Sequence, residues 1–408
     1  MPTQTVRLSP LPLTIPNSKI REIAALRPEI ADPICLYFGE TNLPTPEFIR
    51  QAATRAMEEG YVFYTPTEGY LELREAIATE IERLHGKGID CRNQIIITDG
   101  GVLAAALALR ILLEPGDEAI LISPVWPYLH SNLLLCRAVP REIPLIEADT
   151  GFRLDLNAVK RAINEKTRAL IVNSPNNPTG WVATPEEQKR LWNLCLEHNL
   201  TLLADEVYER LYYGPPGPTA RIRGLSEGTP APSFIDVADN WDHLIIVQSF
   251  SKTYSMTGWR LGYAVAGSRA IAAMTRLNEF TTTCASSISQ RAGLVALQEG
   301  EGYVREMVAR YKDNRDLCYS LAAALPFVRT WKPEGSFYML LRFDGLKDSL
   351  VFAKEVFRRT GVGMAPGVGF GAGGEGSLRL CYAAEPGLLS EAFRRLQIFL
   401  QSYKPGSF

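Results

Sequence analysis

The chain has 408 residues, of which 46% are hydrophobic and 22% charged, and its formal net charge is −2. This balance is typical of ordinary soluble proteins and offers no basic surface of the kind that binds nucleic acid or anionic lipid. A chain of this length is too long for one compact core, so we predict two domains.

The beginning of the chain, its cysteines and its histidines narrow the class of protein further. Residues 1–16 carry four prolines and no continuous apolar core, which argues against a secretory signal. No apolar run approaches the ~18 residues that a membrane span requires. The seven cysteines form no CxxC pair, and the four histidines show no metal-ligand spacing. We therefore predict a cytoplasmic protein with reduced thiols, no metal site, no membrane contact and no nucleic-acid partner.

The first part of the chain is predicted to be an arm, and the middle an alternation of strands and helices. Residues 1–45 are expected to form an extended, proline-punctuated arm with a short helix. The strands expected after it lie at residues 94–98, 119–122, 169–172, 201–204 and 243–248. Between two of them, Thr184, Pro185 and Glu187 suit the N-cap, first-turn and capping-box positions of a helix. Strands that are apolar throughout predict an α/β fold, with a mostly parallel sheet covered by helices on both faces.

The C-terminal part has a different pattern. From about residue 303, long charged helices alternate with short strands such as 336–342 and 377–382, which predicts a smaller α+β domain. Residues 213–240 are rich in Pro, Gly and Ser and are predicted to form a surface loop. We expect three parts: an N-terminal arm that joins the small domain at 1–45, a large domain at 46–295 and the C-terminal small domain at 296–408.

One lysine stands in an unusual place, within the stretch SFSKTYSMTGWRLGY at residues 249–263. Lys252 directly follows a buried strand, and α/β sheets bind their ligands at the carboxyl ends of their strands. Ser249 and Ser251 offer hydroxyl groups, and Arg260 offers a planar, charged fork of the kind that binds phosphate. A lysine with a lowered pKa beside a phosphate site suits a Schiff base with a carbonyl cofactor. The plain alternative is a solvated lysine in a loop.

Pyridoxal phosphate is such a cofactor, and other residues suit its phosphate and its ring nitrogen. Gly101 and Val102 lie between a strand and a helix, where backbone N–H groups bind phosphate, although two glycines before a helix are often only a tight turn. Asp205 ends the strand at 201–204, and a carboxylate there could keep the ring nitrogen protonated. From its position alone, a helix N-cap is an equally good reading of Asp205.

Three more residues follow strands of the same predicted sheet. Tyr208 and Asn177 could donate hydrogen bonds to the phenolic oxygen of the cofactor, although Asn-Pro is also ordinary turn chemistry. Trp126 could stack on the cofactor ring, with packing in the core as the alternative. Their shared position at strand ends favours a common site over separate structural roles.

With these residues in view, the chain resembles the fold-type I pyridoxal-phosphate enzymes, and in particular the class I/II aminotransferase family. The matching stretches, spread from about residue 35 to 385, are GGVLAA, SPVWPY, NSPNNPTG, DEVY, SFSKTYSMTGWRLGY and LRLCYA. The combination of NNPTG with SFSK and a following arginine is the specific part. The resemblance implies transfer of an amino group from an L-amino acid to a 2-oxo acid with ping-pong kinetics.

The resemblance also implies a role for each residue. Lys252 is expected to be the catalytic Schiff-base lysine. The other cofactor contacts are expected from Asp205 at the ring nitrogen, Asn177 and Tyr208 at the phenolic oxygen, Trp126 on the ring, and Gly101, Val102, Ser249, Ser251 and Arg260 at the phosphate. Arg379 is expected to bind the substrate α-carboxylate as a bidentate pair, with Gly39 and Asn177 beside it. Tyr64 resembles a tyrosine that reaches the phosphate of the neighbouring subunit, which implies a homodimer with shared active sites.

The identity of the amino donor and the outcome of the reaction are less constrained. Val102 stands where the aspartate-using branch of the family commonly has a lysine for the distal carboxylate. The side chains expected nearby are apolar or aromatic: Tyr37, Phe38, Leu13 and Ile15. This predicts a lining short of positive charge and a neutral or aromatic donor. Lyases and cyclases of amino acids share the scaffold and are the alternative, whereas a regulator with an added DNA-binding module is disfavoured because the resemblance begins too early in the chain.

Overall fold

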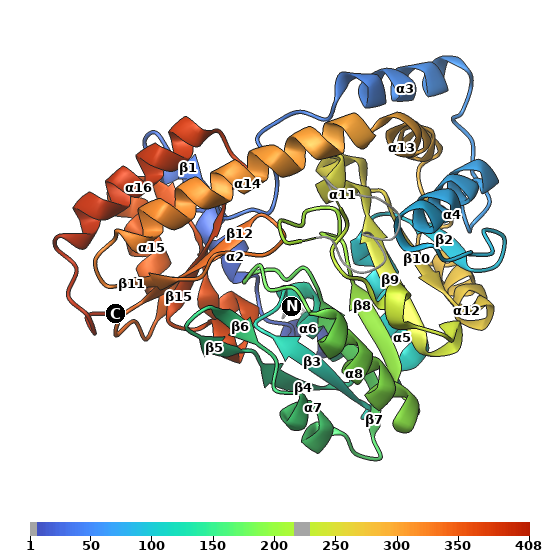
Figure 1. Cartoon of the computed structure of the whole chain (residues 1–408), viewed down its shortest axis with the longest axis horizontal. Coiled ribbons are helices and arrows are strands. Elements are labelled where there is room, and N and C mark those ends of the chain that lie inside the picture. The colour runs from blue at the N-terminus through green and yellow to red at the C-terminus, as the bar shows by residue number, and fades with distance from the viewer. Residues whose placement is uncertain (1–5, 216–228) are drawn as a thin grey trace, which may run out of the picture.

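The computed structural model describes residues 6–215 and 229–408. It contains a seven-stranded sheet with its helices and, beside it, a four-stranded sheet with helices of its own (Figure 1). The order of the larger sheet is β2-β10-β9-β8-β7-β3-β4. Its strands are β2 (Ile95–Thr98), β3 (Glu118–Ser123), β4 (Val139–Pro144), β7 (Thr167–Asn173), β8 (Thr201–Asp205), β9 (Leu244–Ser249) and β10 (Gly262–Ala266).

The larger sheet is parallel except at one strand. β10 runs antiparallel to both β2 and β9, whereas β9, β8, β7, β3 and β4 are parallel to one another. The predicted α/β fold with a mostly parallel sheet is confirmed. Parallel strands that are consecutive in this order end at the same edge, which places the loops after β7, β8 and β9 together.

Alternate side chains along each strand enter two separate cores. In β9, Leu244 and Ile246 join the core on one face, and Ile245 and Val247 join the core on the other. The second core is closed by α5 (Gly101–Leu112), α6 (Pro127–Leu135) and α12 (Ser268–Glu279). The first includes α4 (Leu71–His85), α7 (Leu156–Ala162), α8 (Pro185–Glu197) and α13 (Ser287–Glu299). Because helices cover both faces, the central strands are largely apolar, whereas the edge strand β4 carries Arg141 and Glu142.

The C-terminal part is built on an antiparallel sheet in the order β11-β12-β15-β14. The strands are β11 (Val328–Thr330), β12 (Tyr338–Phe343), β14 (Ala365–Pro366) and β15 (Ser377–Cys381). Its helices are α14 (Glu301–Ala323), α15 (Ser349–Thr360) and α16 (Pro386–Leu400). In Figure 1, α14 runs along the top from this part to α13.

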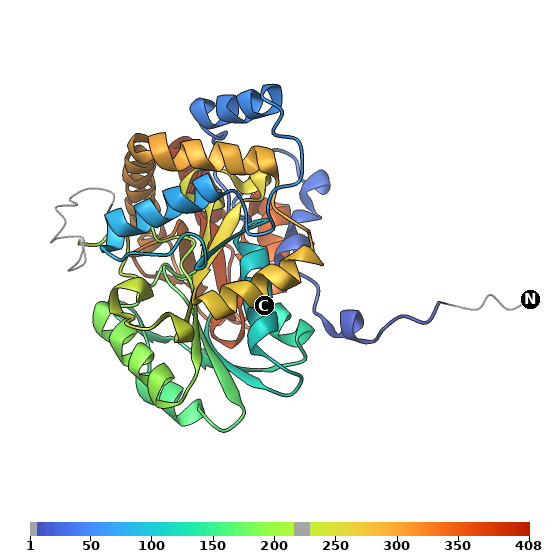
Figure 2. The same ribbon diagram turned by 90° about the vertical axis from the view of Figure 1, so that its right-hand side faces the viewer.

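The N-terminal segment packs against the C-terminal part. It comprises α1 (Leu11–Thr14), α2 (Lys19–Ala24) and β1 (Ile34–Cys35), and the chain then continues into α3 (Glu47–Glu58). β1 pairs in parallel with β13 (Val362–Gly363), and α2 contacts α15. Figure 2 shows α1 and residues 6–10, which precede it, extending away from the rest of the chain. The boundaries predicted at residues 45 and 295 stay a prediction.

The prediction of a surface loop over residues 213–240 is wrong for the part that follows residue 228. Phe234 is fully buried and begins α10 (Phe234–Val237). The cause is the buried carboxylate of Glu206, which accepts hydrogen bonds from Ser233 Oγ at 2.6 Å and from the Phe234 N–H at 2.8 Å. Residues 216–228 of the predicted loop lie outside the described residues.

Candidate active site

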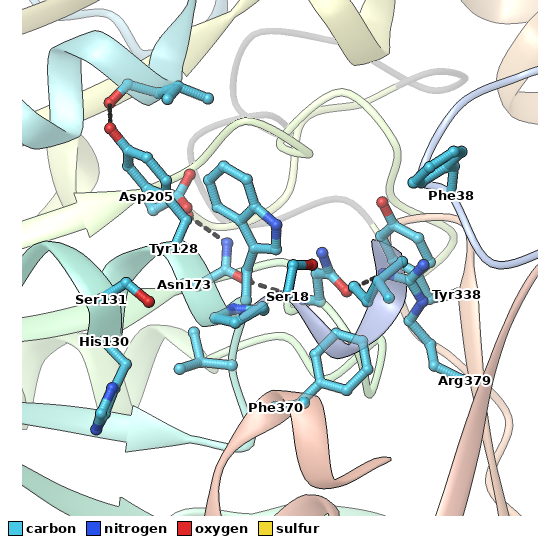
Figure 3. Close-up of a pocket in the computed structure, with 18 of the residues that line it drawn as sticks. Ser18, Phe38, Tyr128, His130, Ser131, Asn173, Asp205, Tyr338, Phe370 and Arg379 are labelled. Atoms are coloured by element: carbon cyan, nitrogen blue, oxygen red, sulfur yellow. Dashed lines mark hydrogen bonds between the residues drawn. The ribbon is translucent and has the colours of Figure 1, made fainter. Parts of the chain in front are cut away.

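A cavity of about 840 Å³ lies where the carboxyl edge of the larger sheet meets the C-terminal part. The predicted site residues that line it are Gly39, Gly101, Val102, Trp126, Asn177, Asp205, Tyr208, Ser249, Ser251, Lys252, Arg260 and Arg379. Figure 3 shows Arg379 and Tyr338 on one side of this pocket and Asp205 and Tyr128 on the other. Residues that are far apart in the sequence therefore share one enclosed space.

The sheet explains why these side chains meet. Asp205 is the last residue of β8, and Gly101 begins α5 just after β2. Lys252 lies in α11 (Phe250–Thr253), a single helical turn that follows β9. Ser249 caps this turn, because its Oγ accepts a hydrogen bond from the Ser251 N–H at 3.1 Å. The cap fixes where the Lys252 side chain leaves the backbone.

The Lys252 amine points into the cavity. Its Nζ donates a hydrogen bond to the carbonyl oxygen of Gly39 at 2.6 Å. Burial lowers the pKa of Lys252 to about 8, and the guanidinium of Arg379 also lowers it. An amine with this pKa is neutral in an appreciable fraction of molecules near neutral pH, so it can act as a nucleophile or as a base.

The Asp205 carboxylate is buried with little compensation. Its hydrogen bond to the Val207 N–H is long, at 3.5 Å. Burial raises the pKa of Asp205 to about 7, although the Val207 N–H and the charge of Lys252 oppose the shift. A carboxylate in this state gains from any cation or N–H donor that enters the cavity.

Arg379 is held rigidly in β15 but keeps free donor capacity. Its Nη1 donates to Asn177 Oδ1 at 3.1 Å, and its Nη2 donates to the backbone oxygen of Tyr37. Its Nε is buried and has no hydrogen-bond partner. The guanidinium lies 4.4 Å from the ring centre of Tyr338 and 5.1 Å from that of Phe370. This fork suits a carboxylate that enters the cavity.

The opposite end of the cavity suits an anion. Arg260 has a left-handed backbone conformation (φ 51°), and its Nη1 donates to the Thr257 carbonyl oxygen at 3.0 Å. A Cβ built on Gly100 would lie 2.6 Å from Arg260 Nη2, so only glycine lets the guanidinium approach the start of α5. Among the described residues, Arg260 forms no ion pair with a carboxylate. The N-terminus of α5 and this guanidinium together form a phosphate-sized positive region.

Trp126 and Tyr64 differ in their relation to the cavity. Trp126 lies in its wall and stacks on Tyr128, with ring centres 4.8 Å apart and planes at 21°. Tyr64 is 87% exposed and is not among the described lining residues. The neighbouring Phe63 and Val62 are also largely exposed on this single chain.

The lining differs from the sequence-based expectation in its charge. Leu13 and Ile15 are not among the described lining residues, whereas Lys19 and Arg21 are. The expectation of a lining short of positive charge is therefore wrong. The reason is that α2, rather than the chain before it, packs beside β14 and the turn that follows it. Lys19 pairs with Glu22 at 2.7 Å, and no ion pair involves Arg21 within the part of the chain that the structure describes.

Among the lining residues that sequence reasoning missed are Asn173, Tyr128, Tyr338 and Phe370. Asn173 donates from Nδ2 to the backbone oxygen of Asp205 at 3.0 Å and so orders the end of β8. Its position at the end of a predicted strand was an available signal. Tyr338 and Phe370 come from the C-terminal part, and their approach to the larger sheet depends on tertiary packing that no local pattern reveals.

These groups fit pyridoxal 5′-phosphate. The uncompensated Asp205 carboxylate matches a protonated ring nitrogen, and the positive region at Gly100 and Arg260 matches the phosphate. Lys252 lines the same cavity, and its amine could bond to a carbonyl carbon there. The buried, unpartnered Nε of Arg379 remains for a substrate carboxylate.

Comparison with known proteins agrees with this fit. Residues 34–396 match the family model for class I and II aminotransferases. The chain is 34% identical to an aspartate aminotransferase of Pyrococcus horikoshii, over 96% of this chain and 97% of that protein. It is 33% identical to aromatic-amino-acid aminotransferase 2 of Thermococcus litoralis, over 95% of this chain and 96% of that protein.

Solved structures give the same result. The structure of Thermus thermophilus aspartate aminotransferase with maleate matches with a TM-score of 0.86 at 32% identity, over 97% of this chain and all of that one. Sequence and fold thus agree over nearly the whole length. The chain belongs to the class I and II aminotransferases, and it is a pyridoxal-phosphate-dependent enzyme that transfers amino groups.

Proposed function

We propose that the cavity holds both cofactor and substrate, with the roles that the resemblance implied. The observation that carries this proposal is the pairing of a buried amine, Lys252, with a buried and poorly compensated carboxylate, Asp205, in one cavity. Two groups with perturbed pKa values that line one cavity are typical of a functional site.

The residues that would hold pyridoxal phosphate surround it. Its phosphate would bind the N–H groups of Gly101 and Val102, the hydroxyls of Ser249 and Ser251 and the Arg260 guanidinium. Its phenolic oxygen would accept hydrogen bonds from Asn177 and Tyr208. Trp126 would cover the ring, and Lys252 would attach to the carbonyl carbon. Asp205 would keep a proton on the ring nitrogen, because a buried carboxylate stabilises a cation beside it.

When bound, the cofactor supplies an electron sink for the Cα–H bond of the amino acid. Arg379 binds the α-carboxylate through its fork and thereby orients that bond. The Lys252 Nζ, freed in its neutral form, takes the Cα proton as a general base. The same residues act in the reverse direction on a 2-oxo acid, so a single cavity serves both halves of a ping-pong reaction.

The preferred amino donor is proposed to be neutral or aromatic. Phe38, Phe370 and Val102 give the cavity apolar surface, and Lys19 pairs with Glu22, a carboxylate that Lys354 also contacts. With 2-oxoglutarate as acceptor, kcat/KM for phenylalanine should exceed that for aspartate by about tenfold, or ~1.4 kcal/mol of transition-state binding. Without the oxo acid acceptor, product should not exceed about one equivalent per active site.

Two outcomes would count against this specificity and reaction. If aspartate is the better donor, Arg21 is the available cation, and Arg21→Ala should then remove the preference while the exposed Arg27→Ala leaves it in place. Steady release of ammonia from one amino acid in the absence of oxo acid would mean a lyase. The donor preference is read from progress curves with the oxo acid present, and ammonia release is read from progress curves without it.

We propose a homodimer in which Tyr64 reaches the phosphate of the partner subunit. The exposed cluster of Val62, Phe63 and Tyr64 supports this, because a monomer leaves it in water. Mixing Lys252→Ala with Tyr64→Phe at limiting cofactor should give more activity than the mean of the two parents. In the mixed dimer, one site has an intact Lys252 together with an intact Tyr64 from the other chain.

The outcome of mixing separates two arrangements. If Tyr64 serves its own subunit, no site in the mixed dimer is complete, and activity stays at the mean of the parents. Sedimentation of the wild type at micromolar concentration provides the second measurement. A fully active monomer would rule out the shared site.

The location and the domain boundaries are likewise proposals. We propose a cytoplasmic enzyme, since all seven cysteines are free, as in reducing compartments. In the described ranges 6–215 and 229–408, no helix has the length and apolar character needed to cross a bilayer. The two separate sheets support a large domain at 46–295 and a small one at 296–408, with residues 1–45 as an arm.

A further inference from the structure

Two tyrosine hydroxyls meet at the wall of the cavity. The Oη atoms of Tyr208 and Tyr338 lie 2.7 Å apart, and both side chains are buried. Their rings are nearly perpendicular, at 82°, with centres 5.5 Å apart. Tyr208 follows β8 in the larger sheet, whereas Tyr338 begins β12 in the C-terminal part. This hydrogen bond therefore joins the two halves of the site.

The direction of this hydrogen bond matters, because each hydroxyl has a single proton. If Tyr208 donates to Tyr338, it has no proton left for a ligand. If Tyr338 donates, the Tyr208 proton is free to point into the cavity. In both cases the distance between the oxygens is the same, so the neighbouring charges decide the direction.

Those charges favour donation by Tyr338. The Arg379 guanidinium lies 4.4 Å from the Tyr338 ring centre, and a cation there makes the hydroxyl a stronger donor. Asp205 and Arg379 act on both hydroxyls, but Arg379 has the larger of the two effects on Tyr338 and Asp205 has the larger effect on Tyr208. The other neighbours are Cys381, whose buried thiol faces Tyr338, and Lys252, whose Nζ lies 5.9 Å from the Tyr208 ring centre and whose charge is disfavoured by burial.

The position of Tyr338 is closely fixed. A Cβ built on Gly39 would lie 1.8 Å from the Tyr338 oxygen, so the hydroxyl occupies the space beside this backbone. Gly39 is also the residue whose carbonyl oxygen accepts the Lys252 hydrogen bond. The Tyr338 hydroxyl can thus neither swing away nor lose its partner without disturbing this wall.

We propose that Tyr338 is a positioning residue that donates its proton to Tyr208 and so commits the Tyr208 hydroxyl to donate to the phenolic oxygen of the cofactor. The inference rests on the proposed function, which places that oxygen beside Tyr208. Tyr338, a residue of the C-terminal part, would thus influence the hydrogen bond to the phenolic oxygen of the cofactor.

The test is a pH titration of the absorbance of the bound cofactor, without substrate. A hydrogen bond donated to the phenolic oxygen favours its anion, so weakening the donor raises the midpoint. Tyr208→Phe should raise the midpoint, and Tyr338→Phe should raise it by less, about half a pH unit. In the double variant the midpoint should equal that of Tyr208→Phe, because Tyr338 acts only through Tyr208.

Tyr382→Phe is the matched control, since it removes a buried hydroxyl that donates to the Ser336 backbone oxygen at 3.2 Å outside the described lining. Its midpoint should be that of the wild type. A wild-type midpoint in Tyr338→Phe, or additive shifts in the double variant, would overturn the inference. If Tyr208→Phe is also unshifted, the inference fails as well, and borohydride fixation of the cofactor on Lys252, read by mass spectrometry, then shows whether the proposed site itself stands.

Discussion

Replacing Lys252 by alanine should abolish transamination and leave a folded protein that still binds pyridoxal phosphate. The amine is expected to supply both the covalent attachment and the base that takes the Cα proton, so turnover should fall on the order of 10⁴-fold or more. Folding should survive, because Nζ makes one hydrogen bond, to the Gly39 carbonyl oxygen, and burial of this amine already disfavours its charge.

The covalent link gives a measurement that is independent of rate. After borohydride reduction, the intact mass of the wild type should increase by one cofactor, and peptide mapping should place the addition on Lys252. Lys252→Ala should show no addition, although dialysis should still retain cofactor held by the phosphate contacts. Lys189→Ala, an exposed lysine on α8, is the control and should behave as the wild type. An active Lys252→Ala enzyme would remove the centre of the proposed function.

The fold could be predicted where burial imposes a pattern on the local sequence. In the strand that precedes Lys252, residues 244–247 are apolar because helices cover both faces of the sheet, and the structure places this strand at β9 (Leu244–Ser249). The capping box of Thr184 and Glu187 is present at the start of α8. Both signals come from contacts within a few residues, which is why the sequence alone carries them.

Other features depend on contacts between distant segments. The buried Glu206 draws Ser233 and Phe234 inward, against a local composition that is typical of a loop. Arg21 reaches the cavity lining because α2 packs on the C-terminal part, a contact between residues more than 300 positions apart. No local pattern encodes such contacts, so both features contradicted the sequence-based expectation.

The site residues also fall into those that the local sequence predicts and those that only the packing of distant segments reveals. Lys252, Asp205 and Asn177 follow strands of one sheet, and the rule that parallel strands end at one edge was enough to bring them together. Tyr338 belongs to a different sheet, and its contact with Tyr208 appears only when the two parts are packed. Residues on the larger sheet were therefore predictable from the sequence, and those facing it from the C-terminal part needed the structure, except for Arg379, which the family resemblance supplied.

Replacing Asp205 by asparagine should have opposite effects on the empty protein and on the loaded enzyme. Burial raises the pKa of Asp205 from 3.8 to about 7, so the folded cofactor-free protein holds this proton more tightly than the unfolded chain does. Its stability should therefore fall as the pH rises from about 4 to 7, by at most about 1.4 kcal/mol per pH unit, and change little from this group above that range. Asparagine cannot ionise and removes this dependence.

The cofactor-free Asp205→Asn protein should accordingly gain stability relative to the wild type between pH 5 and pH 8, measured by denaturant unfolding at both values. The loaded variant should lose activity by about 10²-fold or more, because a neutral amide cannot hold the ring nitrogen protonated while negative charge develops on the ring. Asp149→Asn, at an exposed position, should change neither quantity. The same charge that destabilises the empty cavity is thus expected to be the one that catalysis requires. A variant that keeps wild-type turnover, or a stability difference that does not grow with pH, would show that the Asp205 carboxylate is not the uncompensated charge described above.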